Sequence, residues 1–254
     1  MSRYISPVLY VLLMLVGCMA FVSIAGVRVG IFEPLTGFSM VRESVYASLV
    51  LSVLAIVSLG ACCKERNIGS QRFFFLVLIV SLVYSFMWIG FYLHRSDLPS
   101  INDISTDTEM PPAFLNVNFI RSSNENDLAY NPDWAPIQKK HYPNVKPVFT
   151  PESKQQVYYV VADLVQDRGW DVVAKYPAAG MIEATARTPI FGFRDDVVIR
   201  ILQVDNDKVR IDMRSCSRVG RGDYGVNAQR IESFMTDLNT RLERSTMPKV
   251  NTVR

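Results

Sequence analysis

The stretch Met181–Asn227 decides the fold, and it reads MIEATARTPIFGFRDDVVIRILQVDNDKVRIDMRSCSRVGRGDYGVN. Apolar and polar residues alternate in three of its segments, which is the pattern of strands with two unlike faces. These segments are 181–188, 196–204 and 208–219. The residues between the last two, Asp205-Asn206-Asp207, favour a tight hairpin turn. The stretch therefore predicts an antiparallel sheet with one apolar face and one charged face.

The charged face of this sheet is expected to hold more arginines than acids. By strand alternation it carries Glu183, Asp212, Arg187, Arg200, Arg210, Arg214 and Arg218, with Arg221 at its rim. Pairing between neighbouring strands is one interpretation, and it would make the face structural. A basic pocket for an anion is the other, because the forked guanidinium group matches carboxylate and phosphate.

A glycine-rich loop, Ser217–Asn227, follows the last strand and leads into a helix. Free N–H groups at the start of that helix, with Arg218 and Arg221 nearby, can hold an anion. The plainer interpretation is a turn in which Asp223 holds an arginine. The loop lacks the Gly-Lys-Ser/Thr ending of a P-loop. The candidate ligand-binding residues are Arg187, Arg200, Arg214, Arg218, Arg221 and Asp223.

Residues 150–254 are predicted to form an α+β domain. Thr150 is expected to cap an amphipathic helix that ends at Gly169, and Asn227 to cap a second one. Between the first helix and the three strands lies one more strand, Trp170–Tyr176. The order helix, four strands, helix predicts a four-stranded antiparallel sheet with two helices packed on one face. One core is expected to contain Val161, Leu164, Ile199, Ile211, Phe234 and Leu238.

Residues 1–94 are predicted to be a region of three transmembrane helices. The uncharged apolar runs Pro7–Val27, Ser44–Cys63 and Phe73–Leu93 each have about the length that spans a bilayer, roughly 20 residues. The first connection, residues 28–43, is too apolar for a solvated loop and is broken by Pro34. It predicts a segment that lies in the membrane interface.

The basic residues predict the orientation of these helices. One side of the membrane would carry Arg3, Lys64, Arg66 and Arg72, and the other Arg28, Arg42, Glu33 and Glu43. Because basic residues favour the cytoplasmic side, the N-terminus is expected inside and everything after Leu93 outside the cytoplasm.

Residues 95–149 are expected to form an irregular linker and a Pro-rich segment of the outer domain. Asp103, Asp107 and Glu109 are candidate cation ligands, but their spacing is not that of an EF-hand loop. Residues 95–254 contain 21 Lys and Arg and 21 Asp and Glu, so nonspecific binding of nucleic acid is not expected.

Catalytic signals are weak in this chain. Asp195 and Asp196 are adjacent on a strand, so their carboxylates point to opposite faces and do not converge. The two histidines and scattered cysteines have no zinc-site spacing, and Cys216 has no histidine placed beside it. We therefore expect no metal, no cofactor and no catalytic residue.

Several motifs resemble those of the domain of unknown function 1499 family. They are Asp103-Ile104-Ser105-Thr106-Asp107-Thr108, Pro111-Pro112, Asp195-Asp196-Val197-Val198-Ile199-Arg200, and Asp212–Gly220 with Asp223, Gly225 and Asn227. The resemblance implies an uncharacterised bacterial envelope protein or a plastid relative. It implies no activity, and family members often have another residue at the position of Cys216.

Three functions follow as hypotheses. The first is a non-catalytic protein of the bacterial inner (cytoplasmic) membrane, whose extracytoplasmic domain binds an anionic or other ligand or a membrane-protein partner. The second is a structural subunit of an inner-membrane assembly. The third is a hydrolase acting on lipid or cell-wall material through Asp195, Asp196, Asp212 or Asp223. The lipid bilayer is the expected partner in all three, and nucleic acid in none.

Overall fold

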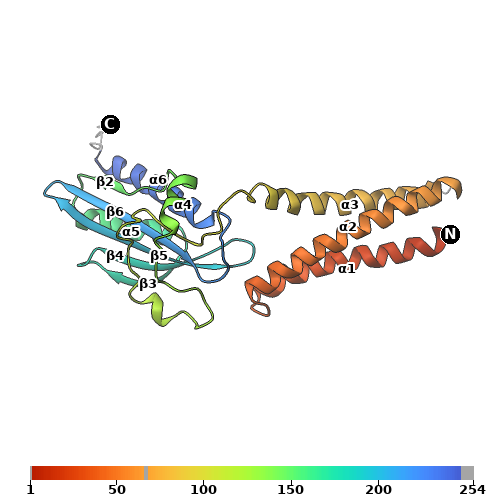
Figure 1. Ribbon diagram of the computed structural model, residues 1–254, viewed down its shortest axis with the longest axis horizontal. Coiled ribbons are helices and arrows are strands. Elements are labelled where there is room, and N and C mark those ends of the chain that lie inside the picture. The colour runs from red at the N-terminus through yellow and green to blue at the C-terminus, as the bar shows by residue number, and fades with distance from the viewer. Residues whose placement is uncertain (1, 66–67, 247–254) are drawn as a thin grey trace, which may run out of the picture. The chain divides into compact units, whose positions relative to one another are not determined.

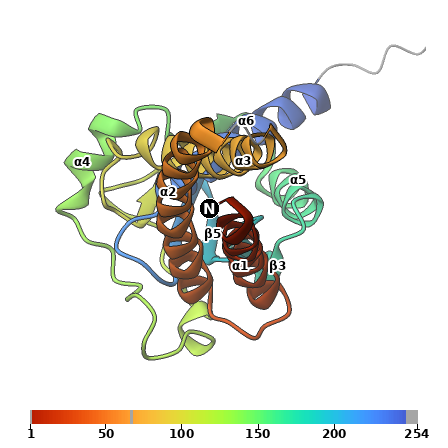
Figure 2. The same cartoon turned by 90° about the vertical axis from the view of Figure 1, so that its right-hand side faces the viewer.

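The computed structural model describes residues 2–65 and 68–246 (Figures 1 and 2). The chain forms two compact units. The first consists of Met1–Asp97 and Pro189–Gly192, and the second of Leu98–Thr188 and Phe193–Arg254.

Three long helices make up most of the first unit: α1 (Ser2–Arg28), α2 (Pro34–Glu65) and α3 (Ile68–Leu93). Each is long and apolar enough to cross a membrane. Residues 34–43, expected to belong to a connecting segment at the membrane interface, are the first turns of α2. Pro34 suits the first helical position, where no N–H is needed. Gly37 lets α2 approach α1, since a Cβ there would lie 2.3 Å from Val27 Cγ2.

Serine side chains join α2 to α3. Ser48 Oγ donates to the carbonyl oxygen of Ser81 at 3.0 Å, and Ser52 Oγ donates to Ser81 Oγ at 2.8 Å. All three residues are buried. Small side chains of this kind allow close helix approach inside a membrane, where packing and hydrogen bonds drive association. Arg66, one of the residues that predict the orientation, lies outside the described residues.

The second unit contains an antiparallel sheet of six strands, not four. Their order is β1-β6-β5-β4-β3, and β2 also pairs with β6. The bounds are β1 (Asp103–Ser105), β2 (Val148–Thr150), β3 (Asp171–Tyr176), β4 (Met181–Arg187), β5 (Arg194–Asp205) and β6 (Lys208–Ser217). The sequence misses β1 and β2 because three residues are too few to show alternation. Asp205 pairs with Lys208, which confirms the predicted hairpin turn.

Two helices, α5 (Lys154–Asp167) and α6 (Val226–Thr246), pack on one face of this sheet and confirm that prediction. The six predicted core residues all lie in the resulting core. Both predicted caps are wrong. Ser153 Oγ, not Thr150, accepts from the N–H of Gln156, and Thr150 belongs to β2. Asn227 lies inside α6, and its N–H donates to the Asp223 carboxylate.

The other face of the sheet is covered by residues 106–131, which we call the cover segment. It contains one short 3-10 helix, η1 (Val117–Phe119), and it is followed by α4 (Trp134–His141), which the sequence did not predict. Phe114, Val117 and Leu128 of the cover segment pack against Val198 and Cys216 of the sheet. The charged face is therefore an interior surface, and its side chains need partners within the protein.

A buried ion-pair network as the candidate functional site

Asp196 occupies the centre of the covered face. The register of β5 places it opposite Thr185 on β4 and Cys216 on β6, and none of its surface is exposed. Its carboxylate accepts hydrogen bonds from Arg218 Nε at 3.0 Å and Arg218 Nη2 at 2.9 Å. Thr185 Oγ1 donates to the same carboxylate at 2.7 Å. This bidentate ion pair holds β4, β5 and the end of β6 together.

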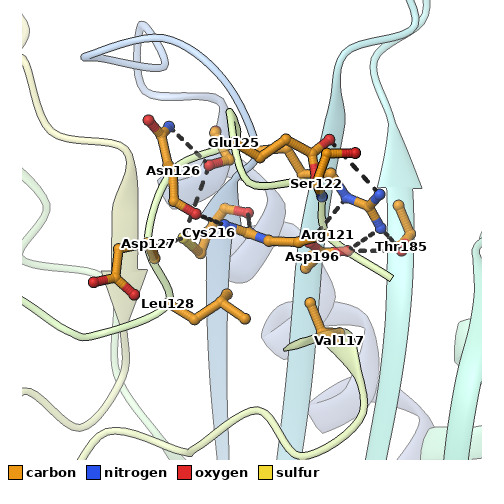
Figure 3. Close-up of polar contacts among 12 residues, drawn as sticks. Val117, Arg121, Ser122, Glu125, Asn126, Asp127, Leu128, Thr185, Asp196 and Cys216 are labelled. Carbon is orange, nitrogen blue, oxygen red and sulfur yellow. Dashed lines mark hydrogen bonds and ion pairs between the residues drawn. The ribbon is translucent and has the colours of Figure 1, made fainter. Parts of the chain in front are cut away.

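Arg121 links the cover segment to this pair (Figure 3). Its Nε donates to Asp196 Oδ2 at 2.7 Å, its Nη1 to the carbonyl of Asn126 at 2.7 Å, and its Nη2 to the carbonyl of Cys216 at 2.9 Å. Glu125 adds a second carboxylate 3.9 Å from Arg218. One guanidinium group thus satisfies backbone carbonyls of both the cover segment and β6.

Arg214 forms a second buried pair, with Asp103 of β1. Arg214 Nε and Nη2 donate to the two carboxylate oxygens at 2.9 and 2.7 Å. The remaining donors reach the carbonyls of Pro112 and Leu128 in the cover segment at 3.1 and 2.6 Å. Burial raises the pKa of Asp103, although Arg214 acts in the opposite direction. The carboxylate therefore depends on Arg214 to stay ionised in this interior site.

A third cluster lies where the face is less deeply covered. Arg200 and Arg210 contact Asp107 and Asp212 at 2.9–3.1 Å. Burial acts to raise the pKa of Asp107. The N–H donors of Met110 and Glu109 and the two arginines together outweigh that effect and lower it.

A buried glutamate anchors the start of η1. Glu183 of β4 has no exposed surface and accepts the N–H groups of Leu115, Asn116 and Val117 at 2.6, 2.9 and 2.9 Å. Three converging backbone N–H groups can stabilise a carboxylate as an ionic partner does. Glu183 therefore fixes the cover segment to β4 without an arginine.

Two of the predicted arginines lie outside the buried network. Arg187 pairs with Asp171 at 3.1 Å, and both side chains are more than half exposed. Arg221 is exposed, and the structure gives it no hydrogen bond or ion pair to any described residue. The structure therefore brings Arg200, Arg214 and Arg218 onto one covered face and leaves Arg221 in solvent.

Asp223 caps α6 and does not hold an arginine. Its carboxylate accepts from the N–H groups of Gly225 at 2.9 Å and Asn227 at 2.7 Å. These are N–H groups that an anion at the helix start would need, so Asp223 fills that position itself. Burial, helped by the nearby Asp195 carboxylate, raises the pKa of Asp223 to about 6 although the two N–H donors act to lower it. Tyr224 and Gly225 have φ of 54° and 78°, the left-handed conformation that lets the loop turn back onto this carboxylate.

The acids of this region are engaged with arginines or backbone N–H groups. Asp195 pairs with Arg230 of α6, on the face opposite to Asp196, as strand alternation predicts. Burial, with a further effect of Asp103, raises the pKa of Cys216 to about 12, so its thiol stays neutral and is a poor nucleophile. No group of His, Cys, Asp or Glu within residues 2–65 and 68–246 is arranged to hold a metal ion. The arrangement is suited to fixing the cover segment on the sheet.

Sequence reasoning missed Arg121 altogether and assigned Asp103 and Asp107 a different chemistry. These two aspartates pair with arginines of β5 and β6, where the sequence suggested a cation site. The sequence did carry one indication of these pairs. The charged face has more arginines than acids, so its arginines required carboxylates from elsewhere in the chain.

Comparisons with known proteins identify the family of this chain. A family model described as a protein of unknown function, DUF1499, matches residues 103–238. This is more than half of the chain, and it contains the whole network from Asp103 to Asp223. A search of curated proteins found no match. The chain belongs to the DUF1499 family.

The Asp103–Arg214 pair gives a prediction about stability. Arg214→Ala leaves a buried carboxylate without its ionic partner, and we expect the free energy of unfolding to fall by about 3–5 kcal/mol. Arg187→Ala removes an exposed pair instead and should change it by about 0–1 kcal/mol. Urea unfolding of the full chain in detergent, followed by near-ultraviolet circular dichroism, measures both. Equal, small losses in the two variants would contradict the structural role of Arg214.

Asp223 gives a prediction about pH. Its pKa is raised from 3.8 to about 6, so the folded chain binds this proton more tightly than the unfolded chain. The stability from this group is fully present below about pH 4 and is lost as the pH rises through about 6. Asp223→Asn cannot ionise. The free energy of unfolding of the natural chain, relative to that of the variant, should fall by on the order of 3 kcal/mol across this range. Parallel pH profiles of the two proteins would show that Asp223 is not the group responsible.

Proposed function

We propose that this chain is a non-catalytic protein of a bacterial inner membrane that binds an anionic ligand at its extracytoplasmic domain. In this proposal α1–α3 cross the bilayer with the N-terminus in the cytoplasm, and the second unit lies outside. The length and apolar character of the three helices support the membrane anchor. The excess of basic residues on the N-terminal side supports the orientation.

Arg221 is the observation that carries the binding proposal. It is the one predicted arginine with an exposed side chain and no partner among the described residues. Its loop contacts the first residues of the second unit. A Cβ on Gly222 would lie 3.0 Å from Ser100 Cα, and one on Gly225 would lie 3.0 Å from Leu98 Cδ1. An exposed guanidinium with no internal carboxylate suits an external phosphate or carboxylate group.

The covalent chain supports a ligand near the lipid headgroups. Leu98 is the fifth residue after Leu93, the end of α3. Five extended residues reach at most about 18 Å. We infer that the Arg221 loop stays close to the level at which the chain leaves the membrane, where anionic lipid headgroups are concentrated.

The second candidate, a structural subunit of an inner-membrane assembly, is favoured by the internal pairing of the charged face. Arg200, Arg214 and Arg218 each have a carboxylate partner already. An anion at these positions would have to displace that partner, so their role in binding stays a prediction. The hydrolase hypothesis gains no support, because the acids that it requires are buried and engaged.

The orientation can be tested with two fusions at the C-terminus of the chain. Alkaline phosphatase is active only outside the cytoplasm, and we expect an active phosphatase fusion. A fluorescent protein that matures only in the cytoplasm should stay dark at the same position. The opposite pair of results would place the DUF1499 domain inside the cell and overturn the proposed localisation.

The binding role can be tested with Arg221→Ala. We expect the affinity of the purified full chain for glycerol phosphate to fall by about tenfold, the loss of one charge-assisted hydrogen bond. The unfolding midpoint should not change, because Arg221 has no partner to lose. Arg241→Ala is the matched control, since Arg241 is a half-buried arginine that pairs with Asp167. Equal affinity in Arg221→Ala and the natural chain would refute the site and leave the structural subunit as the better proposal.

A further inference from the structure

The turn between β4 and β5, residues Thr188–Phe193, has an unusual composition. Hairpin turns in water are rich in Gly, Asn, Asp, Ser and Pro. Here the tip reads Pro189-Ile190-Phe191-Gly192-Phe193. The N–H of Thr188 donates to the carbonyl of Phe193 at 2.9 Å, and the N–H of Phe193 donates to Thr188 Oγ1 at 2.9 Å. These bonds close a defined turn that carries large apolar side chains at its tip.

Within the first unit, the tip is part of an aromatic cluster. The Phe191 side chain is almost fully buried, and its ring centroid lies 5.4 Å from that of Phe38 and 6.2 Å from that of Trp88. Trp88 in turn lies 6.1 Å from Phe91, and the Arg95 guanidinium lies over the Phe91 ring at 4.7 Å. The cluster sits near the start of α2 and the end of α3.

For helices α2 and α3 that cross a bilayer, the start of α2 and the end of α3 lie near the membrane–water interface. Trp and Tyr side chains concentrate at the membrane–water interface, because the ring body prefers hydrocarbon and its polar group prefers the headgroups, and Trp88 supplies such a ring in this cluster. The arginines on both sides of the turn, Arg187 and Arg194, are exposed and suit the phosphate level. Ile190, next to Phe191, is 46% exposed. An exposed isoleucine at the tip of a turn flanked by arginines is the arrangement of an interfacial anchor.

We propose that the β4–β5 turn inserts Ile190 into the interfacial layer of the bilayer, next to Phe191 in the aromatic cluster. This inference rests on the proposed function in one respect, that α1–α3 span the membrane. Burying the exposed part of one isoleucine side chain contributes only a small part of the free energy needed for membrane binding. That contribution is too small to bring a soluble protein to a membrane. In the proposed function the transmembrane helices already hold the turn near the bilayer, so no binding from solution is required.

The small size of the apolar tip argues against a second copy of the chain as its occupant. A stable protein interface covers roughly 800 Å² on each partner, far more than one exposed isoleucine and its neighbours provide. The aromatic cluster also continues directly into the apolar surfaces of α2 and α3, which in the proposed function face lipid. The bilayer is therefore the occupant that matches both the area and the surroundings of the turn.

Photocrosslinking of the full chain tests the inference. Benzoylphenylalanine is placed at position 190 by amber suppression, and the protein is reconstituted into vesicles of phosphatidylethanolamine and phosphatidylglycerol. After irradiation, mass spectrometry of the purified protein measures covalent lipid adducts. Position 204 is the matched control, because Val204 is 50% exposed at the far end of β5, about 30 Å along the strand from Arg194. Position 53 controls for insertion, because Val53 is 59% exposed on α2.

Each outcome decides a different point. Lipid adducts at positions 190 and 53 but not at 204 support the interfacial anchor. Adducts at 53 without adducts at 190, or adducts of equal yield at 190 and 204, overturn the anchor and leave the membrane span intact. Crosslinks from 190 to protein alone also overturn it. The absence of adducts at 53 overturns the span itself, and with it the premise of the anchor.

Discussion

The ion pair between Asp196 and Arg218, shared by Arg121, is the interaction on which the second unit depends. A carboxylate with no exposed surface is tolerated only when ionic partners and hydrogen bonds replace its water. Asp196 receives them from β4, from Arg218 directly after β6 and from the cover segment. Because these donors come from parts of the chain far apart in sequence, the pair forms only when the sheet and its cover are both in place. It therefore specifies how they fit together.

The cover segment explains why so many charges are buried. Apart from η1 it has no regular secondary structure, so many of its backbone N–H and C=O groups need partners outside a helix or a sheet. The charged face supplies them: Arg214 and Arg121 donate to its carbonyls, and Glu183 accepts its N–H groups. A sheet face of apolar side chains could not do this. The charged residues that alternate along the strands therefore supply the hydrogen-bond partners that the irregular cover segment needs.

Alternation made the sheet and the common core predictable from the sequence, since each strand from Met181 onward has one apolar side that two amphipathic helices can cover. It did not reveal the partners of the charged side. Asp103, Asp107 and Arg121 lie in a segment with no periodic pattern, and nothing local indicates which face it covers. For the same reason β1 and β2 were missed, because each exists only through its pairing with β6. Contacts that depend on where an irregular segment lies cannot be found from periodicity.

The distinction between buried and exposed arginines decides what the charged residues can do. A buried guanidinium that is paired with a carboxylate already has partners for its N–H donors and its charge. A ligand must therefore break that ion pair to bind. Exposed Arg221 has no such partner among the described residues, so its donors face solvent. The fold thus separates the arginines of the charged face and its rim into two groups, buried and exposed. Most of these charges hold the domain together, and the proposed anion binding rests on Arg221, in the loop beside the first residues of the second unit.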